Sequence, residues 1–397
     1  PGGAQIYGLM VFVKEIEHAM TLENRTDFND IIYDPVLHQY QTRLKIKGKR
    51  TADCDGKFSS EGFIILDDEL KPNLDNLAQS MGRYHELGFI PVEKESESVS
   101  KTLEYAYDDW TIAQMANSMG EQEDYKTFIE RSQNYINVFD PTTKFMRGRF
   151  RNTWFAPFDP YEVNFNYTEA NSWQYSFYVP HDITGFMNLL GGKDQLEKQL
   201  DNLFTANDKT SGREQADITG LIGQYAHGNE PSHHMAYLYN FVNKPYKTQE
   251  KTRQILTELY TNSPDGISGN EDCGQMSAWY IFSSLGFYPV TPGSNQYIIG
   301  SPLFDKATIH LEDGKLFTVE AKNNSFENKY IKNVQLNNKA YPYSYLKHSA
   351  IVDGGNLVFE MTDTPTNWGT SDDFIPSTEI KDHIIIPVPF IKKGNIV

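Results

Sequence analysis

The feature that most limits how this chain can fold is a change of pattern at about Pro289, in a sequence of 397 residues. Before Pro289, apolar side chains recur at the helical period, so that Leu103, Ala106 and Trp110 share one face of a helix. After it, short apolar runs separated by Gly, Asn, Asp and Pro are typical of strands. Those strands are expected at residues 297–299, 306–311, 316–321, 331–336, 350–351, 356–361 and 383–387.

This pattern predicts a multidomain α+β protein, with a helical region at residues 68–290 and an all-β module at residues 291–397. Residues 1–67 hold no long periodic pattern and are only partly extended. A long irregular stretch, residues 139–180, interrupts the helices, and such stretches in compact domains are usually functional. Helices are expected after Ser100 as N-cap, at 121–137, 182–190, 193–204, 235–242 and 248–261, and from Asp272 to a cap at Gly286.

Charge and composition exclude several kinds of partner. The formal net charge of −17 repels phosphate backbones, so we expect no nucleic acid, whereas a neutral ligand or a cation suits the chain. No stretch approaches the roughly 18 apolar residues of a membrane span. We expect Cys54 and Cys273 to be separate thiols, although a disulfide is the alternative, because a large core needs no covalent staple.

Three polar segments stand out, and each lies where a loop is expected to enter a helix. They are Tyr167–Tyr175, His227–His234 and Gly269–Tyr280, and each combines carboxylates, amides and aromatic rings. Such segments add little to a core, because buried polar groups must find partners. They are typical of the loops where binding and catalysis concentrate. Three of them in one chain predict a single composite site.

Glu169 is the acid of the first segment, and Tyr167, Trp173 and Tyr175 flank it. A carboxyl group among aromatic rings loses hydration, which raises its pKa and keeps it protonated near neutral pH. A general acid needs that property. The alternative interpretation is a loop glutamate that accepts a hydrogen bond from a backbone amide.

Asn229 and Glu230 are the candidate metal ligands of the second segment. Both offer hard oxygen atoms of the kind that calcium prefers. Gly228 and Pro231 constrain the backbone on either side, so the two side chains can be held still.

The same segment allows two other interpretations. His227, Glu230, His233 and His234 could serve as zinc ligands, although their spacing matches neither the HExxH helix nor another familiar zinc motif. Alternatively, Ser232 caps a helix and the histidines face solvent.

Asp272 is the acid of the third segment, at the expected start of a helix. Aspartate is a favoured N-cap there, and the helix dipole stabilises its negative charge. An ionised carboxylate is also what a general base must be, so capping and catalysis are compatible. Together, a protonated Glu169 and an ionised Asp272 form the pair of unlike acids that is typical of glycoside hydrolysis.

Four runs resemble glycoside hydrolase family 92, whose members are calcium-dependent exo-α-mannosidases that act with inversion. The runs are Ser98–Trp110, Thr168–Asp182, Asp217–His234 and Gly269–Val290, and Gly300–Phe304 is also similar. The likeness extends over roughly residues 80–390. It implies an (α/α)6 helical barrel joined to β-sandwich domains, and a substrate that is a mannose-containing glycan.

The resemblance also implies a role for each candidate residue. Glu169 would protonate the leaving oxygen while Asp272 activates water on the opposite face of the sugar. Asn229 and Glu230 fall in the segment associated with calcium, which engages the mannose hydroxyls at C2 and C3. The implied sugar contacts are Trp173, Gln174, His227 and Asn270, and Asn270 could also orient the base or the water.

The sequence departs from the family at its start. Members are much longer and carry an N-terminal β-sandwich that completes the cleft, and the first 80 residues or so do not match that domain. The expected helices also fall short of the twelve of a full barrel. A non-catalytic, carbohydrate-binding fragment of such an enzyme is therefore the alternative function. A periplasmic or secreted location is expected by resemblance, although this chain shows no signal peptide.

Overall fold

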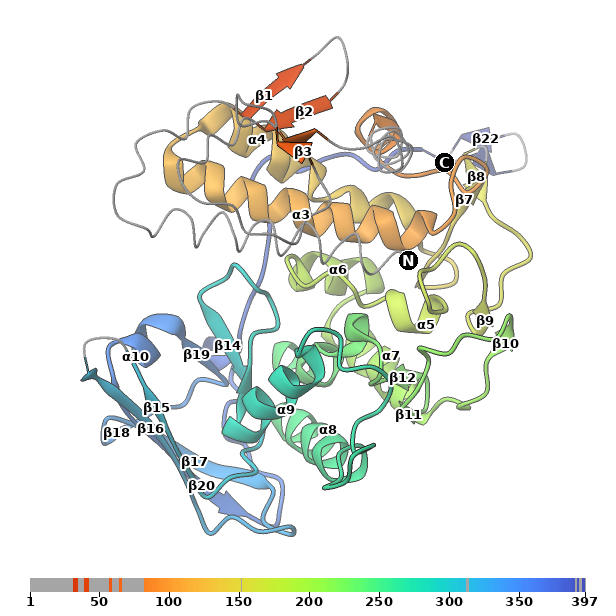
Figure 1. The fold of residues 1–397 in the computed structure, drawn as a ribbon. Helices are drawn as coiled ribbons and strands as arrows, with labels where there is room; N and C mark the ends of the chain where they lie inside the picture. The colour runs from red at the N-terminus through yellow and green to blue at the C-terminus, as the bar shows by residue number, and fades with distance from the viewer. Residues whose placement is uncertain are drawn as a thin grey trace.

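The computed structural model describes residues 82–389, except 151, 312 and 313, and the backbone of three short antiparallel strand pairs outside that range. These pairs are β1 (Ile31–Asp34) with β2 (Gln39–Thr42), β3 (Lys57–Phe58) with β4 (Ile64–Ile65), and β21 (Ile391–Lys392) with β22 (Asn395–Ile396). Apart from these pairs, the expected 1–67 segment lies outside the described residues, and so does Cys54. Figure 1 shows a helical part beside a β-rich part.

In the helical part, a short helical stretch at residues 82–87 precedes a long hairpin of α3 (Ser98–Met119) and α4 (Gln122–Arg131), which the 3-10 helix η1 (Asn134–Val138) follows. The predicted apolar face of α3 is confirmed, since Leu103 and Ala106 are fully buried and Trp110 is 9% exposed. The predicted cap is wrong. Glu97 is the N-cap, and Ser100 lies inside the first turn, where its Oγ accepts a hydrogen bond from the backbone of the Glu169 loop.

The remaining helices follow the predicted order with small shifts at their ends. Asp182 caps α6 through a 3.0 Å bond from the Gly185 amide, and Gly286 ends α9 in the left-handed conformation, as predicted. The elements are α5 (Ser172–Tyr175), α6 (Ile183–Leu190), α7 (Lys193–Thr205), η2 (Glu230–Ser232), η3 (Met235–Val242), α8 (Pro245–Glu258) and α9 (Gln275–Leu285).

The predicted irregular stretch holds only short strands and the single turn of α5. Two antiparallel hairpins come first, and a parallel pair then joins residues about 50 positions apart. These strands are β5 (Phe139–Asp140), β6 (Phe145–Met146), β7 (Arg149–Phe150), β8 (Thr153–Trp154), β9 (Glu162–Val163) and β10 (Ser211–Gly212), and a further hairpin pairs β11 (Leu221–Ile222) with β12 (Tyr225–Ala226). Large rings from this stretch and from the helices share one core.

The β-rich part contains a three-stranded and a five-stranded sheet. Their strand orders are β13-β14-β19 and β15-β16-β20-β17-β18, and all pairs are antiparallel except β16 with β20. The strands are β13 (Phe287–Tyr288), β14 (Gln296–Ile299), β15 (Lys306–His310), β16 (Leu316–Lys322), β17 (Tyr330–Leu336), β18 (Lys339–Ala340), β19 (Tyr345–Lys347) and β20 (Gly355–Thr362).

Five of the predicted strands are confirmed within about two residues at each end. Two predictions are wrong. Residues 350–351 lie in the short helix α10 (His348–Val352), and residues 383–387 form no strand, because their backbone bonds to side chains of the helical part instead. The fold is thus a mixture of helices and strands. Within the described residues the helices close no barrel, and neither the (α/α)6 barrel nor the β-sandwich is confirmed.

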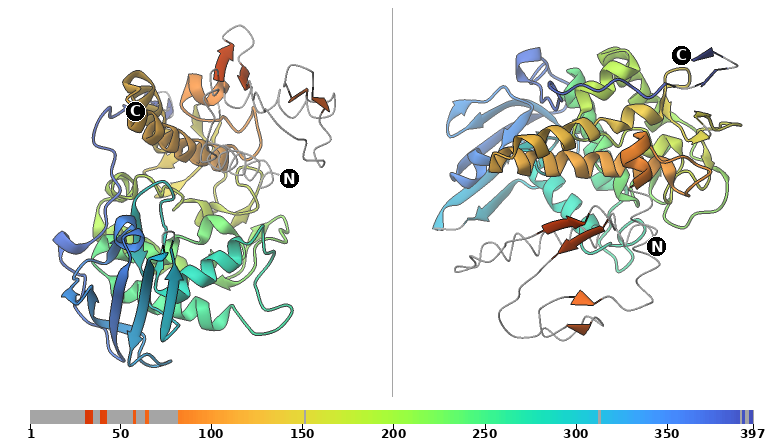
Figure 2. Two further views of the ribbon diagram at one scale, coloured as in Figure 1. Left: turned by 60° about the vertical axis from the view of Figure 1, so that its left-hand side comes forward. Right: turned by 90° about the horizontal axis from the view of Figure 1, so that it is seen from above.

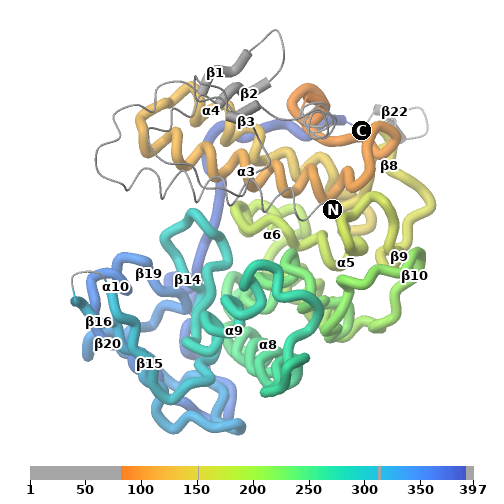
Figure 3. Tube along the Cα trace, viewed as in Figure 1, coloured from red at the N-terminus to blue at the C-terminus, as the bar shows by residue number. Residues whose placement is uncertain are grey.

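The last part of the chain, residues 371–389, returns from the β-rich part to the helical part. The tubes of Figure 3 and the views of Figure 2 show this C-terminal segment running past the sheets to the α3–α4 hairpin. Side chains of the helical part hold its backbone: Asp182 accepts from the Ile380 amide at 3.2 Å, and Asn137 accepts from the Val388 amide at 2.7 Å. Among the described helices, none is both long and apolar enough to span a bilayer.

Candidate active site

The loop that carries Glu169 is fixed against the start of α3. The Thr168 amide donates to Ser100 Oγ at 2.9 Å, and Asn171 caps α5 in a reciprocal capping box with Gln174. Glu169 itself adopts the left-handed conformation, with φ of 52°. Its side chain is half-buried, whereas Thr168 and Ala170 beside it are buried. The backbone therefore turns this one carboxyl group out of the core.

The surroundings of Glu169 favour its protonated form. Burial is the main cause that raises the pKa of its carboxyl group, and the negative charges of Asp217, Glu97 and Asp272 raise it further. The direction is the one that the flanking rings predict.

The second segment contacts the first through Asn229. The Asn229 side-chain nitrogen donates to the Glu169 carbonyl at 3.1 Å, which leaves the amide oxygen of Asn229 as an acceptor beside Glu230. Asn229 is 7% exposed and Glu230 is half-buried at the start of η2. Two adjacent oxygen-bearing side chains fit a calcium ion in kind, with further ligands left to backbone, water or substrate oxygens.

The third segment turns sharply before α9. Asp272 and Cys273 both adopt left-handed backbone angles, with φ of 48° and 56°, and Gly274 is the N-cap in the same conformation. Left-handed geometry costs a residue with a side chain about 1–2 kcal/mol. The prediction that Asp272 is the N-cap of α9 is therefore wrong. Glu271 satisfies the first turn instead, because its carboxylate accepts from the Ser277 amide and hydroxyl, both at 3.0 Å.

Two glycines allow the second and third segments to meet. A Cβ atom on Gly228 would lie 1.9 Å from Thr219 Oγ1, and one on Gly269 would lie 2.9 Å from the same atom and 3.2 Å from the Gly228 carbonyl. Gly269 also has a positive φ of 74°. Larger residues at these positions would separate the loops that carry Asn229 and Asp272. The second segment thus contacts both the first and the third.

Asp217 is a member of this site that the sequence patterns did not identify. Its carboxylate accepts a hydrogen bond from Gln215 and a longer one, at 3.5 Å, from the Asn270 side chain. It also raises the pKa of Glu169 more than any other neighbouring charge does. The only signal in the sequence is that Asp217 opens the run of residues shared with the family.

His227 lies beneath the site rather than at its surface. It is fully buried, its Nδ1 accepts from Tyr225 at 2.8 Å, and its Nε2 donates to Tyr260 at 2.7 Å. These roles follow because the single Tyr260 proton is donated to the Met276 carbonyl at 3.1 Å. Burial lowers the pKa of the imidazole well below its usual value, which agrees with a neutral ring. Both ring nitrogens are thus occupied, and none is left for direct contact with a sugar.

The other two histidines of the segment argue against zinc. His233 Nε2 donates to the His227 carbonyl at 2.9 Å, and His234 Nε2 donates to the Phe177 carbonyl at 2.7 Å. Both rings are buried, so neither histidine faces solvent. Within the described residues, no three His, Cys, Asp or Glu side chains gather as a metal site. Cys273 is an exposed free thiol.

Trp173 and Gln174 are buried in α5, which follows the Glu169 loop. Within the described residues, neither Trp173 Nε1 nor Gln174 Nε2 has a hydrogen-bond partner. Buried donors without partners are costly and rare, so these two point to a ligand or a water molecule in the site.

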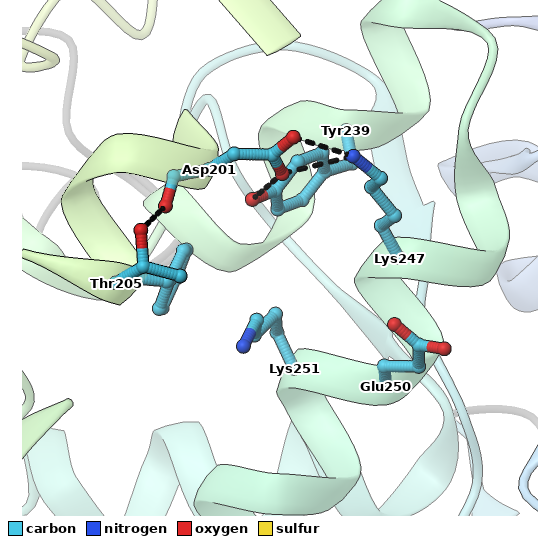
Figure 4. Close-up of a pocket in the computed structure, with 7 residues that line it drawn as sticks. Asp201, Thr205, Tyr239, Lys247, Glu250 and Lys251 are labelled. Carbon is cyan, nitrogen blue, oxygen red and sulfur yellow. Dashed lines mark hydrogen bonds and ion pairs between the residues drawn. The ribbon is translucent and has the colours of Figure 1, made fainter. Parts of the chain in front are cut away.

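A separate hollow between α7, η3 and α8 has a volume of about 350 Å³ (Figure 4). Its charged groups largely satisfy one another. Asp201 accepts from Lys247 at 2.7 Å and from the Tyr239 hydroxyl at 3.0 Å, and Lys251 lies 5.0 Å from the centre of the Phe204 ring. We interpret this hollow as part of the packing among these three helices.

A model of the glycosyl hydrolase family 92 catalytic domain matches residues 50–363. The chain belongs to glycoside hydrolase family 92. Family 92 therefore accounts for most of the described structure, including all three polar segments.

Solved family 92 structures share this fold. An α-mannosidase of Bacteroides thetaiotaomicron, in complex with mannoimidazole, is 42% identical with a TM-score of 0.72, over 79% of this chain and 44% of that chain. An inverting mannosidase of the same species is 37% identical with a TM-score of 0.69, over 76% of this chain and 42% of that chain.

A protein of Arthroderma benhamiae described as an uncharacterized secreted glycosidase is 27% identical over 325 residues, which are 73% of this chain and 40% of the relative. This chain thus spans less than half the length of each of these relatives.

Proposed function

We propose that this chain belongs to an α-mannosidase that removes terminal α-linked mannose from glycans with inversion at the anomeric carbon. The observation that carries the proposal is Glu169, whose pKa is raised by burial and by the nearby Asp217 and Asp272 charges. Family membership and the names of the solved relatives, an α-mannosidase and an inverting mannosidase, agree with it.

In this mechanism Glu169 is the general acid that protonates the leaving oxygen, and Asp272 is the general base that takes a proton from water. Single-displacement inversion needs the two carboxyl groups roughly 6.5–9.5 Å apart, with water between the base and the sugar. The left-handed backbone at both residues supports these roles, because strain is commonly found where a side chain must be held for chemistry.

Asn229 and Glu230 are the proposed ligands of a calcium ion. Bound there, the ion would hold the mannose hydroxyls at C2 and C3. Trp173 Nε1 and Gln174 Nε2 are buried without partners among the described residues, which supports them as donors to the sugar. We propose that Asn270 orients Asp272 or the water. For His227 we propose a supporting role, since Tyr225 and Tyr260 occupy its ring.

The longer relatives motivate three further proposals. The helical region within residues 68–290 belongs to an (α/α)6 barrel, the two sheets of residues 287–362 belong to a β-sandwich module, and the part of the longer relatives that this chain does not match supplies further wall of their sugar site. Because one relative is described as secreted, we also propose a secreted or periplasmic location.

The decisive experiment follows the anomer of mannose released from a defined α-mannoside by proton NMR. We expect β-mannose first, loss of release with a chelator, and recovery with calcium. Glu169→Gln should lower kcat by about 10²–10⁴-fold with an unchanged melting temperature. The matched control is Glu162→Gln, a half-buried acid of the same loop region.

Three outcomes would contradict the proposal. Release of α-mannose first would exclude inversion. Full activity of Glu169→Gln would exclude this residue as the acid. Binding of mannosides without any hydrolysis by the unmodified chain would favour the alternative, a carbohydrate-binding fragment.

A further inference from the structure

A second cavity, of about 470 Å³, lies where the α3–α4 hairpin, the three-stranded sheet and the C-terminal segment meet. We call it the junction cavity, and its chemistry comes from Trp110, Tyr125, His181, Gln296, Glu379 and Asp382. The volume falls in the range of small-molecule sites. Trp110 lies ten residues along α3 from Ser100, which holds the Glu169 loop, and so about 15 Å away from it at 1.5 Å per residue. The cavity is therefore separate from the site around Glu169.

His181 offers the cavity a hydrogen-bond acceptor for which the described residues supply no donor. The ring is 1% exposed, and its Nε2 donates to the Ser132 carbonyl at 2.8 Å. Burial lowers the pKa of the imidazole to about 4, so the ring is neutral and Nδ1 carries a lone pair. Within the described residues Nδ1 has no partner, although His181 lines the cavity. An O–H donor of a ligand would satisfy it.

The rest of the lining suits a ligand that has both hydroxyl groups and a flat apolar face of C–H groups. Trp110 and Tyr125 supply aromatic surface, and the Asp382 carboxylate accepts from the Tyr125 hydroxyl at 3.0 Å with lone pairs to spare. Glu379 forms an ion pair with Lys381 at 3.3 Å, and both line the cavity. Asp382 adds a second acid, so the lining carries a net negative charge. A negative lining disfavours phosphorylated or sulfated ligands and favours neutral molecules that donate hydrogen bonds.

The walls of the cavity are held in place before any ligand arrives. Gln133 binds the C-terminal segment twice, donating to the His383 carbonyl at 2.9 Å and accepting from the Ile385 amide at 3.2 Å. Gln296 donates to the Ser377 carbonyl at 3.4 Å and so joins the sheet side to the same segment. Such preorganisation reduces the entropy lost on binding.

From this geometry we propose that the junction cavity binds a neutral saccharide, with one sugar hydroxyl donating to His181 Nδ1, others to Asp382 and Gln296, and a ring face against Trp110. The site lies apart from the catalytic loops, so its occupation does not depend on the proposed hydrolysis. It would let the protein hold a glycan at a second point.

Fluorine NMR of 5-fluorotryptophan-labelled protein tests the proposal, because the five tryptophans include one reporter in each site. Trp110→Phe assigns the junction resonance, and Trp173 reports the catalytic loops. We expect methyl α-mannopyranoside or methyl α-glucopyranoside at millimolar concentration to move the Trp110 resonance in a saturable way. Asp382→Ala with Gln296→Ala should weaken that affinity by at least about fivefold per lost hydrogen bond.

The matched control is Glu123→Gln, an exposed acid in the first turn of α4 outside the cavity, which should leave the affinity unchanged. A stationary Trp110 resonance, or movement of Trp173 alone, would overturn the proposal. So would an unchanged affinity in the double variant, or a preference for mannose 6-phosphate over the neutral sugars. None of these readouts requires hydrolysis, so failure here and failure of the proposed mannosidase function are distinguishable.

Discussion

The five-stranded sheet and the loops around Glu169 bury very different groups. Along β20, Leu357, Phe359 and Met361 are all buried, while the residues between them face outward, so one alternation specifies the strand. In the loops, Asn229 and His227 are buried, and Asp272 holds a left-handed backbone. The sheet is thus stabilised by contacts that need only apolar shape, whereas the loops depend on individual hydrogen bonds and glycine positions.

The difference has a consequence for mutation. A cavity in the sheet should cost stability and leave chemistry alone, because β20 carries none of the site residues. A small change in the loops should alter chemistry even where it costs less stability, because the three polar segments meet through close contacts.

The largest stability effect is expected for Phe359→Ala, which removes a fully buried ring from the sheet core. It should lower the free energy of unfolding by about 3–5 kcal/mol, while activity per folded molecule stays constant. Val358→Ala, on the less buried face of the same strand, is the control. Urea titration and assays of the folded fraction measure both. A drop in specific activity would show that the sheet supports the loops directly.

Gly228→Ala should lower activity more than stability, the reverse of Phe359→Ala. The new Cβ would meet Thr219 Oγ1 at 1.9 Å and the Ser268 carbonyl at 3.1 Å, so the packing between residue 228 and the start of the third segment must shift. We expect a loss of about 1–3 kcal/mol and a larger proportional loss of activity than in Phe359→Ala. Thr219→Ala in the same chain should restore part of both. Gly82→Ala, with nothing within 4 Å of the added atom, is the neutral comparison.

The buried carboxyl group of Glu104, in the helical part, should make stability depend on pH. Burial raises the pKa of this carboxyl group to about 8, although a 2.7 Å hydrogen bond from Tyr175 lowers it. Since the folded pKa lies above the unfolded one, the stabilising contribution is complete below about pH 4.5 and is lost as the pH rises through 8. Glu104→Gln should therefore gain stability relative to wild type, by about 1 kcal/mol or more, between pH 5 and pH 8. Urea unfolding of both proteins at pH 5 and pH 8 measures this. The same stability difference between variant and wild type at both pH values would contradict the prediction.

The smallest effect is expected for Asp217→Asn. The Asp217 charge raises the pKa of Glu169, so its removal lowers that pKa. If Glu169 is the general acid, the alkaline limb of kcat/KM moves to lower pH, by roughly a few tenths of a unit at an effective dielectric near 20. Glu214→Gln, an exposed acid three residues earlier, should not move the limb. A shift of this limb to higher pH in Asp217→Asn would show that the Asp217 charge does not raise the pKa of Glu169.

The regular elements could be predicted because their patterns are local. Alternation along residues 316–321 and 356–361, and the helical period through Leu103 and Ala106, follow from which side chains one element buries. The parallel pairing of β16 with β20 could not be predicted, since it joins strands far apart in the sequence. The strand prediction for residues 383–387 failed for the same reason, because the hydrogen-bond partners of their backbone are side chains about 250 residues earlier.

Residue type could predict that the three polar segments lie together, but it could not predict their detailed geometry. Polar density marked Glu169, Asn229 and Asp272, and the contacts bring their segments together. Gly274 is the N-cap of α9 and Glu271 accepts from its first turn, because the backbone before the helix is left-handed, which composition does not predict. Asp217 was missed because its contribution to Glu169 is electrostatic and acts across the fold.

The contacts between Asn137 and Val388, 251 positions apart, have a consequence during synthesis. At about 5–20 residues per second, a ribosome needs roughly 10–50 seconds to add that stretch. Throughout this interval the growing polypeptide exposes amide groups of Gln133 and Asn137 whose intended partners do not yet exist. Until then water satisfies these amides, so the junction between the helical part and the C-terminal segment can form only after residues 383–388 have been synthesised.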